Sequence, residues 1–360
     1  MNHVNEPREE PELEPLQPEP ATVNPLPRTV RTPRKVRVPG PGLPMAIGWL
    51  ILLVVAQAGF AAVGFIIEGQ KMGLVTFAFS TCGVFLTTLL FVVAMYGRDG
   101  REKLAVRLPR LKQLALVVLL STPLMVVVSE IGACLVDLFR RAGVPDWMMA
   151  PKELSEIIDS VRQSNLWFGT TVLVFFGGLM PGLGEELFFR GFVGRGLVAR
   201  LGIVGGVLLT SLLFGLLHLY VVQALAAFLI GLLLHTIYFW TRSLIAPIVL
   251  HALYNSQIFV AAVLTRDSTH DLADDDHVPL VLALLSAITS LGLVYLLYRS
   301  RVRWVRTDGA DWTPGFPSTE TPPAHAETGL VCGPIGPGRI VVVAAIYLLF
   351  TADLVWEIVR

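Results

Sequence analysis

The chain has 360 residues, of which 54% are hydrophobic and 16% are charged, and its formal net charge is zero. A soluble domain usually carries about one quarter charged residues, and a nucleic-acid-binding domain usually carries a basic excess. The composition therefore excludes an ordinary soluble domain, gives no signature of a nucleic-acid partner, and is typical of a membrane protein.

The first 44 residues differ from the rest of the chain. They contain eleven prolines, with glutamates early and cations later. Such a segment has too little apolar surface to form a core, and it places the first apolar run too far from Met1 for an ordinary cleaved signal peptide. We expect residues 1–44 to be a disordered, proline-rich cytoplasmic tail.

Nine apolar runs follow, each about the length that a helix needs to cross a hydrocarbon core. They lie near 46–67, 74–96, 114–136, 166–184, 202–220, 222–240, 244–264, 279–298 and 340–357. The sequence therefore predicts an all-α fold, a polytopic transmembrane helix bundle with eight or nine spans.

The runs and the segments between them predict the organisation of the chain. We expect N-terminal transmembrane helices at 45–140, a helix bundle that carries the site at 166–265, an acidic outer loop and a transmembrane helix at 266–305, a flexible linker at 306–338, and a C-terminal transmembrane helix at 339–360. Between the first two, 141–165 is an outer amphipathic segment. Its apolar stripe (Leu154, Ile157, Ile158 and Val161) either lies flat in the interface or caps the bundle.

Cations favour one orientation. Alternate loops are basic, whereas the loops between them are poor in cations or acidic. Because cytoplasmic loops of membrane proteins carry the excess of lysine and arginine, the N-terminus is expected in the cytoplasm and the protein in the cell membrane. The basic positions are Arg98, Arg101, Lys103, Arg107, Arg110, Lys112, Arg195, Arg200, Arg242, Arg299, Arg301, Arg303 and Arg306.

Ionisable side chains inside apolar runs are costly and therefore informative. Pro181 interrupts the fourth run, and a helix that restarts after it would carry Glu185 and Glu186 in its first turns. Glu186 and Arg190 are four residues apart and can pair on one helical face, which leaves Glu185 without a partner in its own segment and suited to act as a general base. The alternative is that the three residues mark a cytoplasmic helix end.

Two further apolar segments carry polar side chains. Phe214 lies one turn before His218, and His251 and Asn255 share a face four residues apart. Taken alone, each is explained as well by packing or by interhelical hydrogen bonds. Glu186 and His218 lie level if the chain turns back near Gly202, and His251 reaches the same depth only if the 190–206 hairpin extends into the cytoplasm.

In chain order, the motifs Glu185-Glu186-x-x-x-Arg190, Phe214-x-x-x-His218 and His251-x-x-x-Asn255 resemble the CPBP family of type II CAAX prenyl endopeptidases and related bacteriocin-processing or immunity proteins. The resemblance covers roughly 166–265. It implies that Glu185 activates water with assistance from His218, that His251 and Asn255 stabilise the oxyanion, and that Glu186 and Arg190, with Phe214, maintain the site. The tail, the acidic outer loop and the last span depart from the resemblance.

The motifs contain no serine or cysteine nucleophile beside a base, which favours metal-free activation of water. A divalent metal such as zinc remains the alternative, with Glu185, His218 and His251 as its ligands, although the His-Glu-x-x-His spacing is absent. The three cysteines (Cys82, Cys134 and Cys332) show no metal-binding spacing.

The expected partners are membrane lipid and a peptide or protein substrate, prenylated or not, and the sequence leaves the oligomeric state open. A catalytically inactive membrane partner of the immunity type would keep the same residues. A proton-coupled transporter also uses intramembrane charges, but the chain shows no internal duplication. Outside the motifs, His235 is expected to pack, and His270 and His277 flank a solvated acidic loop that would bind a cation weakly at most.

Overall fold

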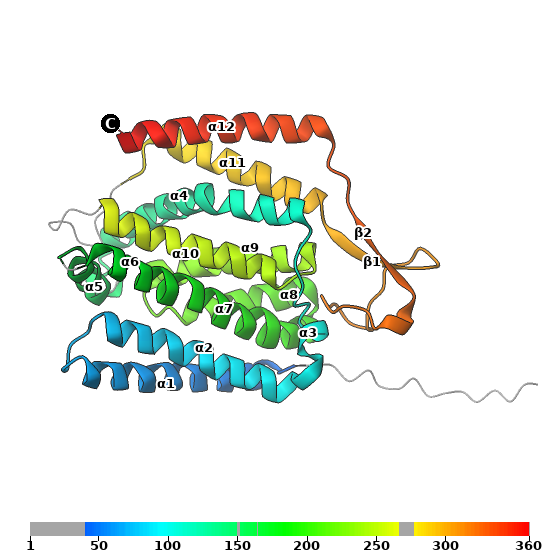
Figure 1. Ribbon diagram of the computed structural model, residues 1–360, viewed down its shortest axis with the longest axis horizontal. Helices are drawn as coiled ribbons and strands as arrows, with labels where there is room; N and C mark the ends of the chain where they lie inside the picture. The colour runs from blue at the N-terminus through cyan, green and yellow to red at the C-terminus, as the bar shows by residue number, and fades with distance from the viewer. Residues whose placement is uncertain (1–39, 150–151, 164, 266–276, 360) are drawn as a thin grey trace, which may run out of the picture. The chain divides into compact units, whose positions relative to one another are not determined.

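The computed structural model describes residues 40–149, 152–163, 165–265 and 277–359 (Figure 1). Most of the predicted tail, the acidic stretch 266–276 and His270 lie outside these ranges. The helices are α1 (Leu43–Ile67), α2 (Leu74–Tyr96), α3 (Gly100–Lys103), α4 (Leu111–Arg141), α5 (Lys152–Gln163), α6 (Leu166–Leu173), α7 (Met180–Glu186), α8 (Gly194–Leu216), α9 (Val221–Thr241), α10 (Ile245–Thr265), α11 (Leu280–Arg299) and α12 (Pro337–Val359). The strands are β1 (Val302–Arg306) and β2 (Thr328–Cys332).

Within the described residues, eight helices are long and apolar enough to cross a membrane. This confirms the predicted all-α polytopic bundle, and the chain is an integral multi-pass membrane protein. Two of the nine predicted runs, 166–184 and 202–220, fall in one continuous helical stretch, Leu166–Leu216, which explains why eight helices contain nine apolar runs.

That long stretch turns back on itself at Gly202, whose φ of 76° and ψ of 175° are not helical. A positive φ is a conformation that glycine adopts without the Cβ penalty of other residues. The two arms then approach closely, because a Cβ at Gly206 would lie 2.4 Å from the Cα of Val198. The turn that the sequence predicts at 199–202 is therefore present.

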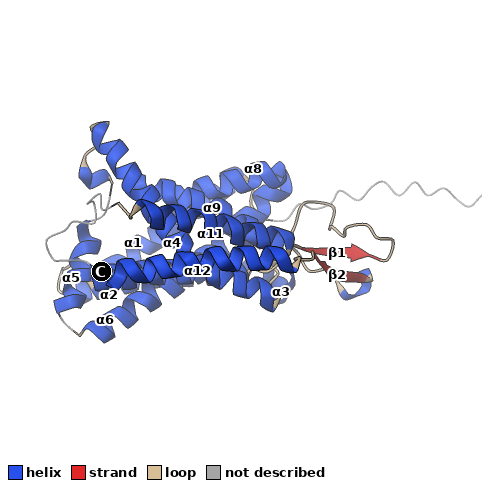
Figure 2. Cartoon of the chain, turned by 90° about the horizontal axis from the view of Figure 1, so that it is seen from above, coloured by secondary structure: helices blue, strands red, loops and turns tan. Residues whose placement is uncertain are grey.

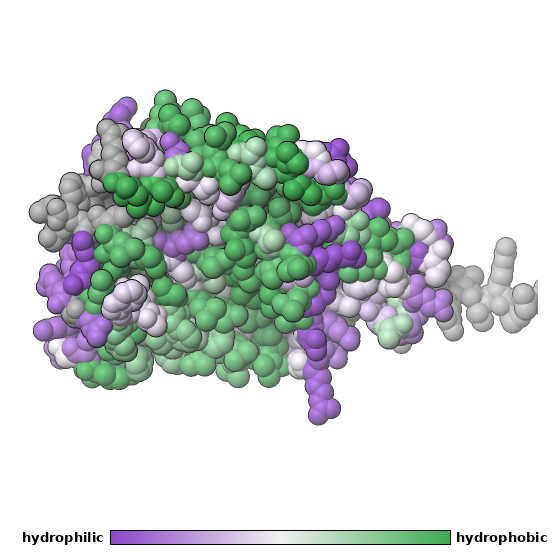
Figure 3. All heavy atoms as spheres, turned by 45° about the horizontal axis from the view of Figure 1, so that its top comes forward, coloured by the Kyte–Doolittle hydropathy of each residue, from purple (hydrophilic) through white to green (hydrophobic). Residues whose placement is uncertain are grey.

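The long helices pack side by side. Contacts join α1 to α2, α2 to α7, α7 to α10, α10 to α4, α4 to α11 and α11 to α12, as Figure 1 shows from bottom to top. Large apolar side chains are exposed along the outer helices, for example Ile51 and Ile66 of α1 and Val341 and Leu348 of α12. Figure 3 shows hydrophobic residues over the middle of the helices and hydrophilic residues toward the ends, an arrangement that suits a bilayer.

The predicted linker 306–338 differs from the expectation, because it contains ordered structure. Strands β1 and β2 pair antiparallel, with Trp304 opposite Leu330, and form a β-hairpin at one end of the helices (Figure 2). We call this end the hairpin end and the other the distal end. Strand β2 alternates partly buried and exposed residues, the pattern of a strand with one face covered.

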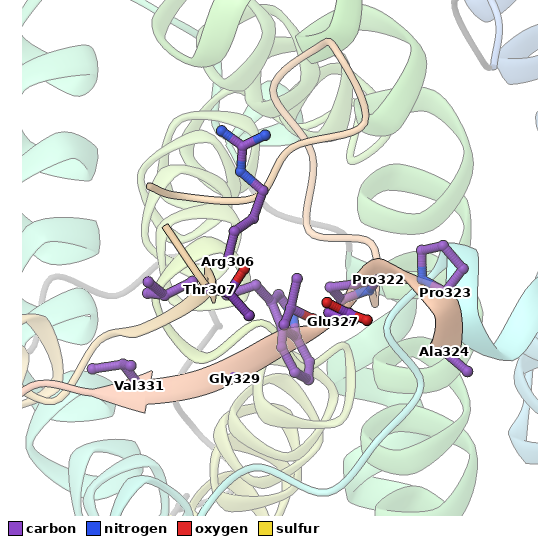
Figure 4. A pocket seen from close by; sticks show the side chains of 11 residues that line it. Arg306, Thr307, Pro322, Pro323, Ala324, Glu327, Gly329 and Val331 are labelled. Atoms are coloured by element: carbon purple, nitrogen blue, oxygen red, sulfur yellow. The ribbon is translucent and has the colours of Figure 1, made fainter. Parts of the chain in front are cut away.

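A surface groove of about 790 Å³ lies on this β-hairpin (Figure 4). Arg306, Pro322, Pro323, Glu327 and Val331 are among the residues that line it. None of the predicted site residues lines the groove, so it has no part in the assignment of the active site.

The amphipathic helix α5 caps the distal end of the bundle. Its apolar residues Ile157, Ile158 and Val161 are buried with Leu173 of α6 and Val263 of α10 in one cluster. Of the two positions expected for this stripe, the structure favours the cap, because a helix lying flat in the interface would turn these side chains toward lipid.

Glu68, which follows α1, caps the first turn of α2. Its carboxylate accepts hydrogen bonds from the backbone of Val75 (3.2 Å) and from the backbone and hydroxyl of Thr76 (2.9 and 2.8 Å). Partial burial opposes ionisation, but these hydrogen bonds outweigh it and hold the pKa of Glu68 below its ordinary value of 4.5. The charged form is therefore the form that the fold stabilises.

Glu68→Gln is expected to cost about 1 kcal/mol at neutral pH, the usual value of a helix cap. A lowered pKa gives stability that is present above the ordinary value of 4.5 and is lost as pH falls through the folded value. The wild-type and variant unfolding temperatures in detergent should therefore differ at neutral pH and converge as pH falls through the folded pKa of Glu68. The exposed Glu102→Gln is the control, and an equal shift in that variant would contradict the assignment.

Candidate active site

The helix that carries the glutamates is irregular but unbroken. Two π-helical segments, η3 (Val174–Leu179) and η4 (Leu187–Val193), flank α7, and Pro181 occupies the first turn of α7. The predicted restart after Pro181 is therefore wrong. The wider π-helical turn ahead of Pro181 already shifts the hydrogen-bond register, so the missing N–H does not open the helix.

Small residues bring this helix close to α10. A Cβ at Gly182 would lie 3.0 Å from both the Cβ and the nitrogen of Ala252, and one at Gly178 would lie 2.0 Å from the hydroxyl of Ser256. The glycines thus allow the two backbones to approach, and Ala252 directly follows His251. This approach places the glutamates against the histidine of α10.

Glu186 and Arg190 form the ion pair that their spacing predicts. Nη1 of Arg190 lies 2.6 Å from Oε1 of Glu186, and neither side chain is exposed at all. Nη2 of Arg190 donates to the carbonyl of Gly231 on α9 at 3.0 Å, and the guanidinium lies 4.6 Å from the ring centroid of Phe214. The pair therefore links three segments of the bundle, α7–η4, α9 and α8.

His251 lies between the two glutamates. Its Nδ1 is 2.9 Å from Oε1 of Glu186, and its Nε2 is 3.8 Å from Oε2 of Glu185. Because an ionised carboxylate only accepts hydrogen bonds, Nδ1 carries a proton toward Glu186, and Nε2 faces Glu185. Hydrogen bonds are shorter than 3.8 Å, whereas a water molecule bridges groups across such a gap.

Glu185 lacks the partners that Glu186 has. Its side chain is 13% exposed, and Oε2 is buried without a hydrogen bond in the described structure. An unpaired buried carboxylate oxygen is costly, and a catalytic role is one explanation for such a group. Oε2 of Glu186 is also buried without a hydrogen bond, but its Oε1 contacts Arg190 and His251, whereas the carboxylate of Glu185 has no hydrogen bond in the described structure.

His218 is placed differently from the expectation. Helix α8 ends at Leu216, so His218 lies in the turn before α9 rather than in a helix. Its Nδ1 hydrogen-bonds the carbonyl of Phe214 at 3.0 Å. The Phe214 ring lies between the two histidines, 5.1 Å from His218 and 5.8 Å from His251, and no hydrogen bond in the described chain joins His218 to a glutamate.

This turn lies at an unusual depth. The arm between Gly202 and Leu216 has about 14 residues and a length of about 21 Å, which is shorter than the roughly 30 Å hydrocarbon core. Irregular backbone at such depth is tolerated where it meets protein or a watery cavity. The interruption that the sequence indicates at Pro181 is found instead beside His218, next to Leu219 with its positive φ of 62°.

Asn255 lies on α10 one turn after His251 and is half-buried. The structure therefore gathers Glu185, Glu186, Arg190 and His251 by direct contact, and adds Phe214, His218 and Asn255 around them. Glu186 and His218 are each 16 residues from Gly202, whereas His251 is nine residues from Arg242. The three residues lie at one depth if the turn at Gly202 extends about 10 Å beyond the turn at Arg242.

The ligands of the alternative zinc site are not a compact set in the described structure. Glu185, His218 and His251 are not among the sets of three potential ligand atoms within 4.8 Å of one another, and in the described ranges the one such set is Glu130, Cys134 and His277.

Sequence reasoning missed the groups that enclose the hairpin end of the site helix. Arg195 pairs with Glu320, and Arg242 donates to the carbonyl of Ser318. Glu320 is 125 residues from Arg195 and lies in a segment without periodicity, so no local pattern connects the two. His235 is buried and stacks on Phe239 at 5.6 Å, in line with the packing role expected for it.

Comparison with known families agrees with this geometry. Residues 167–257 match the family model described as type II CAAX prenyl endopeptidase Rce1-like, and this range holds every predicted site residue. Comparisons with curated proteins and with solved structures found no match. The segment 167–257 of this membrane protein is therefore similar to the Rce1-like type II CAAX prenyl endopeptidases, which supports the resemblance of its motifs to the CPBP family.

Proposed function

We propose that the protein is an intramembrane endopeptidase that hydrolyses peptide bonds of membrane-associated proteins or peptides with water activated by Glu185. The observation that carries the proposal is the position of His251, held at 2.9 Å by Glu186 and facing the unpaired Glu185 at 3.8 Å. The Rce1-like domain supports a protease-type activity.

Glu185 and His251 hold the attacking water. Glu186 fixes the ring through Nδ1, so that Nε2 is left as an acceptor. A water in the gap donates one proton toward Oε2 of Glu185 and the other toward Nε2 of His251, which leaves its lone pairs for the substrate. Glu185 accepts a proton as the oxygen bonds to the carbonyl carbon, and this proton passes to the leaving amine as the C–N bond breaks.

The developing oxyanion needs donors. The Asn255 amide is placed one turn beyond His251 and supplies one, since amide side chains donate through their NH₂ group. His218 lies on the other side of the Phe214 ring from His251 and assists in activating the water. His251, assigned to the oxyanion by resemblance, is better used to orient water because Glu186 occupies its Nδ1.

The hairpin end faces the cytoplasm in this proposal. Arg195 and Arg242 lie at this end, as do Arg107 and Arg110, which contact Trp304 and Leu330 of the β-hairpin. Basic residues favour the cytoplasmic side of a membrane. The substrate would then be a peptide with a membrane-held part, and a C-terminal prenylated cysteine is the first class to test, given the family description.

The test is cleavage of a diverse peptide library, with and without a prenylated C-terminal cysteine, by the purified protein in proteoliposomes. Glu185→Ala runs beside it, and fragments are identified by mass spectrometry. Fragments made only by the wild type would establish the endopeptidase and show whether it needs the lipid. An intact library with folded wild-type protein would replace the proposal with the inactive binding-partner alternative.

A further inference from the structure

A second group of chemically reactive side chains lies at the distal end, away from the candidate active site. Glu130 and Cys134 lie on α4, and His277 lies on the segment that leads into α11. One oxygen, sulfur or nitrogen atom from each falls within 4.8 Å of the others. We propose that these three residues bind a divalent transition metal of the zinc type, with water completing the shell.

The spacing of the ligand atoms suits such an ion. The Sγ of Cys134 lies 3.6 Å from Oε1 of Glu130, and Nδ1 of His277 lies 2.9 Å from the same oxygen. With bond lengths of about 2.0–2.3 Å, the ligands of a tetrahedral zinc lie roughly 3.2–3.8 Å apart. The sulfur already has this separation, and the histidine needs to move outward by less than about 1 Å.

The surroundings are those of a metal-bound histidine. A ligating imidazole normally donates its other N–H to a carboxylate, and Nε2 of His277 lies 3.6 Å from Oδ2 of Asp137. Asp137 is in turn paired with Arg141 at 3.1 Å. The second oxygen of Glu130 accepts a hydrogen bond from the backbone of Val278 at 2.9 Å, which orients the carboxylate.

The ligand types select the ion. Thiolate with imidazole favours zinc over magnesium or calcium, which prefer oxygen ligands. On binding, Cys134 releases its thiol proton to solvent, and Nδ1 of His277 binds as the neutral nitrogen while Nε2 keeps the proton toward Asp137. Cys134 and His277 are exposed and Glu130 is half-buried, so the ion has access from the distal surface.

The site would join α4 to the start of α11, two helices that pack together. It is independent of the proposed peptidase activity, since none of its residues lies in the active site. A bound ion stabilises the folded protein by mass action. Its expected effect is to raise the free energy of unfolding by holding α4 and the start of α11 together at the distal end.

The experiment uses Co²⁺ as a spectroscopic probe and Zn²⁺ as competitor, with the full-length protein in detergent under a reductant. One Co²⁺ per chain should give a thiolate charge-transfer band that Zn²⁺ removes. Cys134→Ser should lose the band, and Cys332→Ser, which changes a cysteine on β2, should keep it. Asp137→Asn should raise the Co²⁺ dissociation constant about 10–100-fold.

Unfolding gives a second measurement. Zn²⁺ should raise the unfolding temperature of the wild type and of Cys332→Ser, but not that of His277→Gln. A missing thiolate band in the folded wild type, or a band that survives in Cys134→Ser, would overturn the proposal. The same result would leave the peptidase assay unaffected, so the two proposals fail separately.

Discussion

Glu185→Gln is expected to reduce kcat by about 10²–10⁴, the usual contribution of a general base, without loss of stability. The amide keeps the shape of the side chain but cannot accept the proton of water. Because Oε2 of Glu185 is buried without a hydrogen bond, removing its charge relieves a cost of the folded state, as at many active sites. Peptide cleavage in proteoliposomes and unfolding in mixed micelles measure the two effects.

The adjacent Glu186→Gln is the matched comparison, because Oε1 of its carboxylate contacts both Arg190 and His251, whereas the carboxylate of Glu185 has no hydrogen bond in the described structure. This variant should lose both activity and stability. If Glu185→Gln also destabilised the protein by several kcal/mol, Glu185 would be a structural residue, and the activity loss would carry no information about chemistry.

Arg190→Met is expected to destabilise the protein by about 3–5 kcal/mol, the cost of leaving one partner of a buried ion pair. Both charges are fully buried, and the guanidinium also donates to Gly231 of α9. Without the guanidinium, the hydrogen bond of Glu186 that remains in the described structure is the one with His251. Equilibrium unfolding in mixed micelles would show the change, and Arg98→Met, at an exposed position between helices, should show little.

A double variant tests whether the pair itself is the cause. Glu186→Gln with Arg190→Met removes both charges, and buried pairs replaced together often cost little. The double variant should therefore lose much less stability than the sum of the single changes. Strict additivity would mean that the two side chains act independently and that the ion pair does not hold the site.

The sequence was informative where chemistry and helical spacing agree. Glu186 and Arg190 pair at four residues, and the rarity of intramembrane charge singled out Glu185 and His251 before any geometry was known. The turn at Gly202 followed from its position between two apolar runs. These features depend on local spacing or on the high cost of a polar group in lipid, and both can be read along the chain.

Features that depend on distant packing could not be predicted. Pro181 was expected to break the helix, but η3 and the contacts of Gly178 and Gly182 with α10 keep it continuous. The end of α8 at Leu216 has no proline or charge to mark it, so the placement of His218 in a turn was missed. Cys134 and His277 are 143 positions apart, and only the packing of α4 against α11 brings them together.

The order of synthesis constrains how this protein matures. Glu320, which pairs with Arg195, and Ser318, whose carbonyl accepts from Arg242, are translated after every residue of the active site. The side-chain amide of Gln113 likewise donates to the carbonyl of Ser300, which is synthesised later. A nascent chain that ends at 257 therefore has buried donors without acceptors, and the excised family domain should be a substrate for quality control rather than an enzyme. The proposed active site is complete only after residues 318–320 have been synthesised.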